Sequence, residues 1–294
     1  MSMERENPYL RYSRIHQLME WKRYKEAMDE AMALIREEPE DADAYAMLGQ
    51  VCLRLDKREE ALHWSQEALR RDPDNRIAWF VRTVAYYESE NWKALDEALD
   101  NAQRVDPYEP QYYFLRANAC NRRSKYADAR DLLLTGLELS PQNALFLAAL
   151  SYTEALLGNR SASKTYASEA LRQDVESDHV YLYLGWAAER RNDYDDQLLM
   201  LKNAIRLDPE NKQIREAYLE SLQKSYKFYR ILLAPTNVLK RLKPWQVLLS
   251  WFIAVLLFRP LIIVFIVLYV LTHWATKWLV HVKVFGWPWS RFKR

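Results

Sequence analysis

Glycine is scarce in this sequence, with five residues in 294. This scarcity disfavours an all-β fold and an enzyme built around glycine loops, and it suits helices. The sequence also lacks the His-Glu-x-x-His, Cys-x-x-Cys and Gly-x-Ser-x-Gly motifs, and its five histidines are scattered. We therefore expect an all-α protein that is not an enzyme and that binds neither a cofactor nor a metal.

Acidic residues are absent from the last quarter of the chain. All 40 of them lie in residues 1–220, whereas residues 221–294 carry 12 of the 42 basic residues. A basic, Trp-rich segment without acids suits the surface of an anionic membrane. The acidic excess of the first part argues against nucleic-acid binding there. We therefore expect the two parts of the chain to have different surroundings, with lipid as a partner of the second.

An apolar stretch is missing from the start of the sequence. The chain opens with Met-Ser-Met-Glu-Arg-Glu-Asn-Pro, which is mostly polar. A cleaved secretory signal would need a continuous apolar region there. We therefore expect no such signal and a cytoplasmic location for the part of the chain that precedes the C-terminal segment.

Prolines recur with one fixed period, at positions 39, 73, 107, 141 and 209. Val175 stands at the skipped position and still follows an acid, Asp174. A helix-breaking proline once in about 34 residues fits a unit of two helices and two turns. Small residues, which let helices approach closely, recur in the same register. They include Ala27, Ala61, Ala129 and Ser163, and a second set of Ala68, Ala102, Gly136, Ala170 and Ala204.

A large residue followed four positions later by a small one also recurs, as in Tyr45 with Gly49 and Tyr181 with Gly185. This pattern resembles the tetratricopeptide repeat. The resemblance covers about two thirds of the chain, and the stretch 204–211, Ala-Ile-Arg-Leu-Asp-Pro-Glu-Asn, matches the family pattern almost letter for letter. The first repeat departs from it in its first helix, as a terminal repeat with one missing neighbour often does.

The resemblance implies a superhelical solenoid of six helix-turn-helix repeats. Residues 212–230 continue as one amphipathic helix without a partner of its own, which we interpret as a cap on the last repeat. The predicted segments are a lead-in (1–7), the repeats (8–41, 42–75, 76–109, 110–143, 144–177 and 178–211), the capping helix (212–230), a basic linker (231–246), a membrane segment (247–272) and a Trp-rich interfacial tail (273–294).

The two cysteines, Cys52 and Cys120, occupy equivalent positions in repeats 2 and 4. Stacked helices lie about 8–10 Å apart. Equivalent positions two repeats apart therefore exceed the limit of about 7 Å between the Cα atoms of a disulfide. We expect both thiols to be reduced and buried.

In this family the first helix of each repeat lines a concave groove, so the resemblance implies binding of a protein or peptide partner. Aromatic and arginine side chains are typical of such binding surfaces. The alternative is that Phe80, Phe114 and Tyr152 partly pack against neighbouring repeats. The predicted groove residues are Tyr12, His16, Gln50, Arg54, Phe80, Tyr87, Glu88, Phe114, Asn118, Asn121, Arg122, Tyr152, Trp186 and Arg190.

One subclass of the family grips the C-terminal carboxylate of chaperones with a lysine and an asparagine on the first groove helix. Tyr12 and His16 stand at the matching positions here. Binding of chaperone tails is therefore not expected. Asn118 and Arg122 instead offer a polar spot in an otherwise aromatic groove, where they could hydrogen-bond a peptide backbone or an acid.

Residues 247–272 are apolar almost throughout, except at Arg259-Pro260. As one helix they would extend about 39 Å, enough to cross a hydrocarbon core of about 30 Å. The alternative is a re-entrant hairpin turned at Arg259-Pro260, because basic residues flank both ends and the positive-inside rule favours the cytoplasm for each. Trp274 and Trp278 follow among basic residues, as in an interfacial aromatic belt.

Two functions remain open from the sequence. The first is a membrane-anchored scaffold or adaptor that binds a partner at the cytoplasmic face. The alternative is an assembly or stability subunit of a transport, secretion or synthase complex that acts through its membrane segment. Arg259 would separate the two, because a charge within a membrane usually marks a partner acid or a water-filled site.

Overall fold

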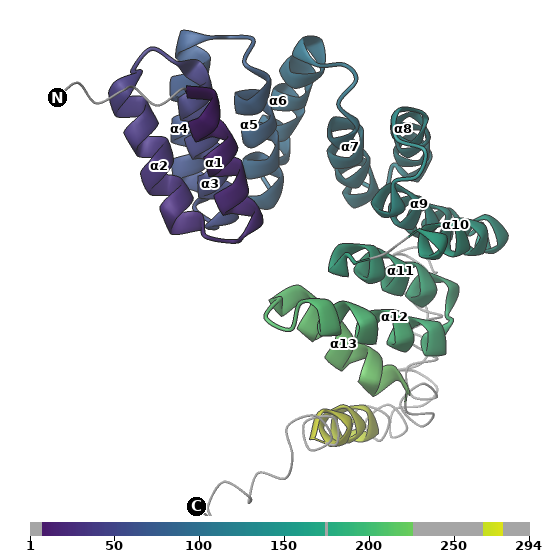
Figure 1. Ribbon diagram of the computed structural model, residues 1–294. Coiled ribbons are helices and arrows are strands. Elements are labelled where there is room, and N and C mark those ends of the chain that lie inside the picture. Colours follow the sequence, from purple (N-terminus) through teal and green to yellow (C-terminus); the bar gives the residue numbers. More distant parts are fainter. Residues whose placement is uncertain (1–7, 174–175, 226–266, 279–294) are drawn as a thin grey trace, which may run out of the picture. The chain divides into compact units, whose positions relative to one another are not determined.

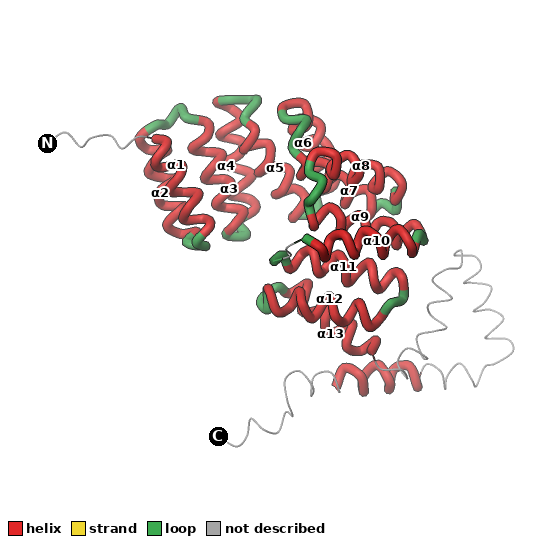
Figure 2. Tube along the Cα trace, turned by 45° about the vertical axis from the view of Figure 1, so that its right-hand side comes forward, coloured by secondary structure: helices red, strands yellow, loops and turns green. Residues whose placement is uncertain are grey.

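The computed structural model describes residues 8–173, 176–225 and 267–278, and within these ranges all the regular structure is helical (Figures 1 and 2). The expectation of an all-α repeat fold is therefore confirmed. The helices are α1 (Pro8–Glu20), α2 (Tyr24–Glu37), α3 (Ala42–Arg54), α4 (Arg58–Arg71), α5 (Arg76–Glu88), α6 (Trp92–Val105), α7 (Pro110–Arg122), α8 (Tyr126–Leu139), α9 (Ala144–Leu157), α10 (Arg160–Arg172), α11 (Asp178–Arg191), α12 (Tyr194–Leu207), α13 (Lys212–Ser225) and an unlabelled helix of residues 267–278.

The helices belong to two compact units, Met1–Phe146 and Leu147–Arg294. In the first unit each helix packs against the next one in the chain, as α1 does with α2 and α3 with α4. The first helices of successive repeats also contact one another, α3 with α5 and α5 with α7. In the second unit α11 packs against α12, and α12 against α13.

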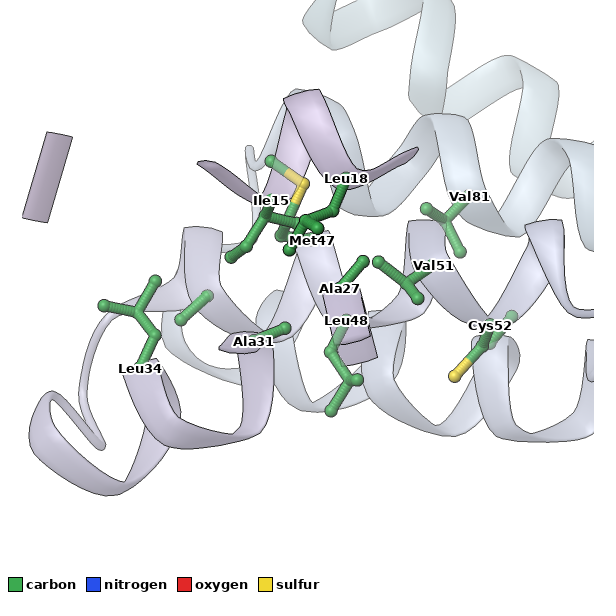
Figure 3. Close-up of a cluster of buried hydrophobic side chains, with 12 residues drawn as sticks. Ile15, Leu18, Ala27, Ala31, Leu34, Met47, Leu48, Val51, Cys52 and Val81 are labelled. Atoms are coloured by element: carbon green, nitrogen blue, oxygen red, sulfur yellow. The ribbon is translucent and has the colours of Figure 1, made fainter. Parts of the chain in front are cut away.

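Small residues at the helix contacts form the centre of the core. Ala27, Ala61 and Ala129 are fully buried, and so are Ala68 and Ala102 of the second recurring set. Figure 3 shows larger side chains around Ala27 in the first two repeats, where Ile15 and Leu18 of α1 lie beside Met47 of α3. The methyl side chains let two backbones approach closely, while the long ones fill the space between adjacent repeats.

Serines take the place of small apolar residues where α9 meets α10. Ser151 Oγ donates to the carbonyl oxygen of Ser163 at 2.8 Å, and Ser163 Oγ donates to the carbonyl oxygen of Ser151 at 2.7 Å. Arg191 of α11 is buried, and its Nη1 donates to Ser163 Oγ at 2.7 Å. These buried polar groups are satisfied by one another, and they join three helices of the second unit.

The turn inside each repeat has the same backbone conformation. One residue has a positive φ at the same position of every repeat, and its successor donates an N–H bond five residues back, as Asp193 does to the Ala188 carbonyl at 2.9 Å. This bond is typical of a Schellman C-cap, which ends a helix with a left-handed residue. Of the six residues with a positive φ, five are not glycine, so side chains are tolerated at this position. The six residues are Lys22, Asp56, Glu90, Ser124, Gly158 and Asn192.

Replacing Gly158 with alanine should lower stability by about 1 kcal/mol, since a Cβ disfavours the left-handed conformation while the loss of glycine's flexibility offsets part of that cost. Steric clash adds nothing, because a Cβ at Gly158 would meet no atom within 4 Å. Thermal unfolding measures the effect. Gly158→Asn is the matched control and should lose less, since Asn192 occupies the equivalent site with φ of 63°. Equal melting temperatures for the two variants would contradict this account.

The last labelled helix, α13, closes the apolar end of the sixth repeat. Asn211 caps it by accepting from the backbone N–H groups of Gln213 and Ile214, at 3.0 and 3.3 Å. Ile214 is fully buried and forms one cluster with Leu182 and Leu201. The segment therefore covers α11 and α12, as the interpretation of a cap requires; residues 226–230 of the predicted helix lie outside the described residues.

Ile214→Ala should destabilise the second unit by about 2–4 kcal/mol, because it removes buried methyl groups and leaves a cavity. Leu199→Ala on α12 is the matched control, since Leu199 is 52% exposed and packs little. Chemical denaturation followed by circular dichroism compares the two. A similar loss in both variants would mean that α13 does not act as a cap.

The cysteines differ in burial. Cys52 is fully buried, whereas Cys120 is only partly buried, so the expectation of two buried thiols holds for the first alone. Burial, with a smaller contribution from Glu60, raises the pKa of the Cys52 thiol to about 11. Burial also raises the pKa of Cys120. Both are free thiols of low reactivity.

Iodoacetamide at pH 8 should therefore alkylate Cys120 faster than Cys52, because attack requires an accessible thiolate. Mass spectrometry of tryptic peptides measures the two rates in one sample. The difference should disappear in denaturant, where both thiols are exposed. Equal rates in the folded protein would refute the burial of Cys52.

Candidate partner-binding surface

The groove residue predicted nearest the N-terminus, Tyr12, has a structural role. Its hydroxyl donates to Asp41 Oδ2, and Asp41 in turn caps α3 by accepting from the backbone N–H of Asp43 at 3.0 Å. Burial and the bond to Asp41 raise the pKa of Tyr12 well above its ordinary value. Tyr12 therefore ties α1 to the start of α3. His16, one turn further along α1, is exposed, and Phe80 on α5 is half-buried.

Tyr87 and Arg122 meet around Trp92 at the turn of the third repeat. The Tyr87 ring lies edge-on to Trp92, with centroids 5.9 Å apart, and the Arg122 guanidinium lies over the same ring at 5.1 Å. Arg122 Nη2 also donates to Glu90 Oε2 at 2.9 Å. The cation expected to hold a ligand is thus engaged with a neighbouring repeat, in a contact that links α7 to the third repeat.

Phe114 and Asn118 are buried, at 5% and 6% exposure, which leaves little surface for a ligand. The Phe114 ring packs on Phe146 with centroids 5.4 Å apart. Phe146 in turn covers Gly136 so closely that a Cβ there would collide with the ring. The alternative that Phe114 packs against the neighbouring repeat is therefore the one observed. Of the predicted polar spot, Asn118 is buried, whereas the Arg122 side chain is exposed and pairs with Glu90.

In the second unit, Tyr152 of α9 and Trp186 of α11 come together with Tyr183. The ring centroids lie 5.8 Å apart for Tyr152 and Trp186, 6.2 Å for Tyr152 and Tyr183, and 5.1 Å for Tyr183 and Trp186. Tyr183 is buried and supports the other two, which are half-buried. We call these three rings the aromatic surface. Edge-to-face and tilted packing at these distances is favourable for aromatic side chains.

Tyr183 did not figure among the predicted site residues. Its repeat position holds Met47, Val81, Leu115 and Ala149 in repeats 2 to 5, all of them buried core residues, and the exposed Ser13 in repeat 1. A tyrosine at an otherwise aliphatic core position was the signal that could have revealed it. The buried Tyr183 ring packs beneath the two outer rings. A prediction that considers only the residues lining the groove therefore does not find Tyr183.

Two cations, one on α11 and one paired with α11, differ in their surroundings. Lys224 of α13 is largely buried and pairs with Glu189 at 2.5 Å and Glu220 at 2.7 Å. Burial lowers the pKa of Lys224, but the two carboxylates outweigh it, so the pKa lies above its ordinary value. Arg190 is exposed and forms no ion pair among the residues that the structure describes. Arg190 is therefore the cation available to a ligand.

In the described ranges no three His, Cys, Asp or Glu side chains gather to hold a metal ion. Of the residues predicted to lie at the membrane, Trp274 and Trp278 are exposed on the helix of residues 267–278. Arg259 and Pro260, with most of the predicted membrane segment 247–272, lie outside the described residues. None of the helices that the structure describes is long and apolar enough to span a bilayer.

Comparison with known proteins places the repeats in a family. The chain is similar to the human mitochondrial import receptor subunit TOM70, at 23% identity over 193 residues, 62% of this chain and 31% of that protein. It is also similar to the human cell division cycle protein 16 homolog, at 29% identity over 115 residues, 36% of this chain and 18% of that protein. It thus spans less than a third of either relative.

Among solved structures, a tetratricopeptide repeat protein from Parabacteroides merdae matches with a TM-score of 0.61 and 13% identity, over 74% of this chain and 86% of that chain. At this identity the match supports the fold alone. The tetratricopeptide repeat profile itself matches residues 22–75, 85–144 and 150–218. Since these ranges make up more than half of the sequence, the chain belongs to the tetratricopeptide repeat family.

Proposed function

We propose that this chain is a scaffold that binds a partner protein or peptide through the aromatic surface of its second unit. Its C-terminal residues attach it to an anionic membrane, and its repeats lie on the cytoplasmic side. The proposal needs no catalytic group, cofactor or nucleic acid. It applies the binding role of tetratricopeptide repeats to a specific set of side chains in this chain.

The aromatic surface is the observation that carries this proposal. Tyr152 and Trp186 offer large, half-buried rings whose orientation is fixed by the buried Tyr183 behind them. Tryptophan, tyrosine and arginine are the residue types that contribute most to binding energy at protein interfaces. Rings that are already held in place lose little conformational entropy when a partner binds. These properties favour a binding surface over a purely structural contact.

Arg190 indicates the chemistry of the partner. It follows Trp186 by one helical turn and is exposed, while the neighbouring Lys224 is neutralised by Glu189 and Glu220. A guanidinium without an internal carboxylate partner can form a bidentate pair with one from a ligand. A segment that carries an apolar or aromatic side chain close to an acidic one would therefore suit this surface.

The membrane attachment is supported by the sequence of the last part of the chain. Residues 221–294 carry 12 basic residues and no acid, and residues 247–272 are almost entirely apolar. Basic residues next to an anionic leaflet are attracted by about 1 kcal/mol each. The second candidate, an assembly subunit that acts through its membrane segment, is favoured by one feature, the charge of Arg259 within that apolar run.

Affinity capture of the full chain in mild detergent, read by quantitative mass spectrometry, tests the proposal. Trp186→Ala should weaken the specific partner by about 30-fold, because truncating an interface anchor costs about 2 kcal/mol or more. Trp21→Ala is the matched control, since Trp21 is an exposed tryptophan in the turn between α1 and α2. That variant should retain the partner at the wild-type level.

Arg190→Glu guards against a loss caused by misfolding, since Arg190 is exposed and its reversal should leave the melting temperature unchanged. This variant should also lose the partner. Arg259→Leu separates the two candidates. Retention of the partner in Trp186→Ala and Arg190→Glu, together with its loss in Arg259→Leu, would reject the scaffold and favour the assembly subunit.

A further inference from the structure

The helix of residues 267–278 has the reverse of the polarity expected for a water-soluble protein. Its exposed side comprises seven apolar residues and one lysine, Lys277. Trp274 is 72% exposed, and the five other large apolar side chains are between 40% and 58% exposed. They are Val267, Leu268, Val270, Leu271 and Trp278.

The covered side of the same helix is polar. Tyr269, Thr272, His273 and Thr276 recur at the helical spacing of three and four residues, so they form one stripe. Thr276 is fully buried, and its hydroxyl donates to the carbonyl oxygen atoms of Thr272 at 2.7 Å and His273 at 3.0 Å. The Tyr269 and His273 rings stack with centroids 6.3 Å apart. The Thr276 hydroxyl is thus satisfied without water.

This reversal is unfavourable in water and favourable in lipid. A soluble monomer rarely exposes a continuous apolar patch of this kind. In a bilayer the surroundings are as apolar as leucine, so apolar side chains face outward while threonine and histidine turn toward protein. Hydroxyl groups that bond their own helix carbonyls are also suited to surroundings without water.

The charge of this part of the chain favours a bilayer over a protein partner as the apolar surroundings of the helix. The helix carries Lys277, and Lys283, Arg291, Lys293 and Arg294 follow it, with no acid among them. A protein partner would have to supply apolar and acidic surface together, whereas an anionic bilayer provides both along its whole face. Trp278 follows Lys277 directly and Trp274 precedes it by three residues, and tryptophan is enriched at the level of lipid headgroups.

We infer that the outward face of residues 267–278 contacts the acyl chains of an anionic bilayer, with Thr272 and Thr276 turned away from lipid. This inference rests on the proposed membrane attachment and deepens it. The apolar side chains of this face contact lipid, and the polar face with Thr272 and Thr276 is covered by protein.

Spin labels on adjacent residues test which face meets lipid. In full chains with Cys52→Ala and Cys120→Ala, nitroxides are placed at Leu271→Cys or its neighbour Thr272→Cys, and at Val270→Cys or its neighbour Tyr269→Cys. The chains are reconstituted in vesicles of phosphatidylcholine with phosphatidylserine. Collision with oxygen, which concentrates in hydrocarbon, is compared with collision with a water-soluble nickel chelate. Thermal melting checks that each variant remains folded.

The Leu271 and Val270 labels should collide with oxygen several-fold more often than the Thr272 and Tyr269 labels, and rarely with nickel. Frequent nickel collisions at Leu271 would place that face in water, and few collisions of either kind would place it against protein; both results overturn the inference. Vesicle flotation shows whether a negative result concerns only the assigned helix face or also the proposed membrane attachment. Chains that float but show no contrast between neighbours refute only the inference, whereas chains that do not float refute the attachment itself.

Flotation also tests the assigned lipid charge. Wild-type chains should float with phosphatidylcholine–phosphatidylserine vesicles to a greater extent than with phosphatidylcholine vesicles, and added salt should reduce the difference. Equal flotation with the two vesicle types would remove the anionic lipid from the inference.

Discussion

The close approach of paired helices is the constraint on which the repeats depend. It requires a side chain no larger than a methyl or hydroxymethyl group at most of the contacts, as at Ala27, Ala61 and Ser163, all of them fully buried. A larger residue at such a site separates two backbones and disturbs the packing of the next repeat. Gln197 occupies an equivalent position in the sixth repeat and is buried, with its Oε1 lacking a hydrogen-bond partner among the described residues. Leu95, at the equivalent position of the third repeat, is a second exception and is fully buried.

Periodicity is what made the fold predictable from the sequence. Each repeat needs a residue that ends its second helix and small residues where its two helices touch. These requirements recur in every repeat, so prolines and small residues recur at the same positions of the sequence. The candidate surface was less predictable, because exposure depends on what the adjacent repeat supplies. Phe114 occupies an expected lining position, yet the ring of Phe146 covers it. Tyr183 occupies an expected core position, yet it holds the surface rings in place.

Arginine residues illustrate the same limit of sequence reasoning. Arg122 and Arg190 occupy equivalent positions four residues from the lining positions of Asn118 and Trp186. Glu90 and Trp92 of the preceding repeat engage Arg122, whereas Arg190 has no such carboxylate among the described residues. The sequence pattern identifies Arg122 as a lining residue, but it does not show that Glu90, 32 positions earlier, pairs with its charge. A sequence search for free cations must therefore compare adjacent repeats pairwise.

The uniform turn within each repeat has a consequence for how such a chain can change in length. Lysine, aspartate, glutamate, serine, glycine and asparagine all occupy its left-handed position, so the junction makes little demand on local sequence. A duplication or deletion of one whole period would join one such junction to another with the backbone direction unchanged. Recombination between repeats can therefore lengthen or shorten the array without an intermediate that is unable to fold, whereas an insertion of one or two residues within a helix would turn the residues that follow it away from their contacts.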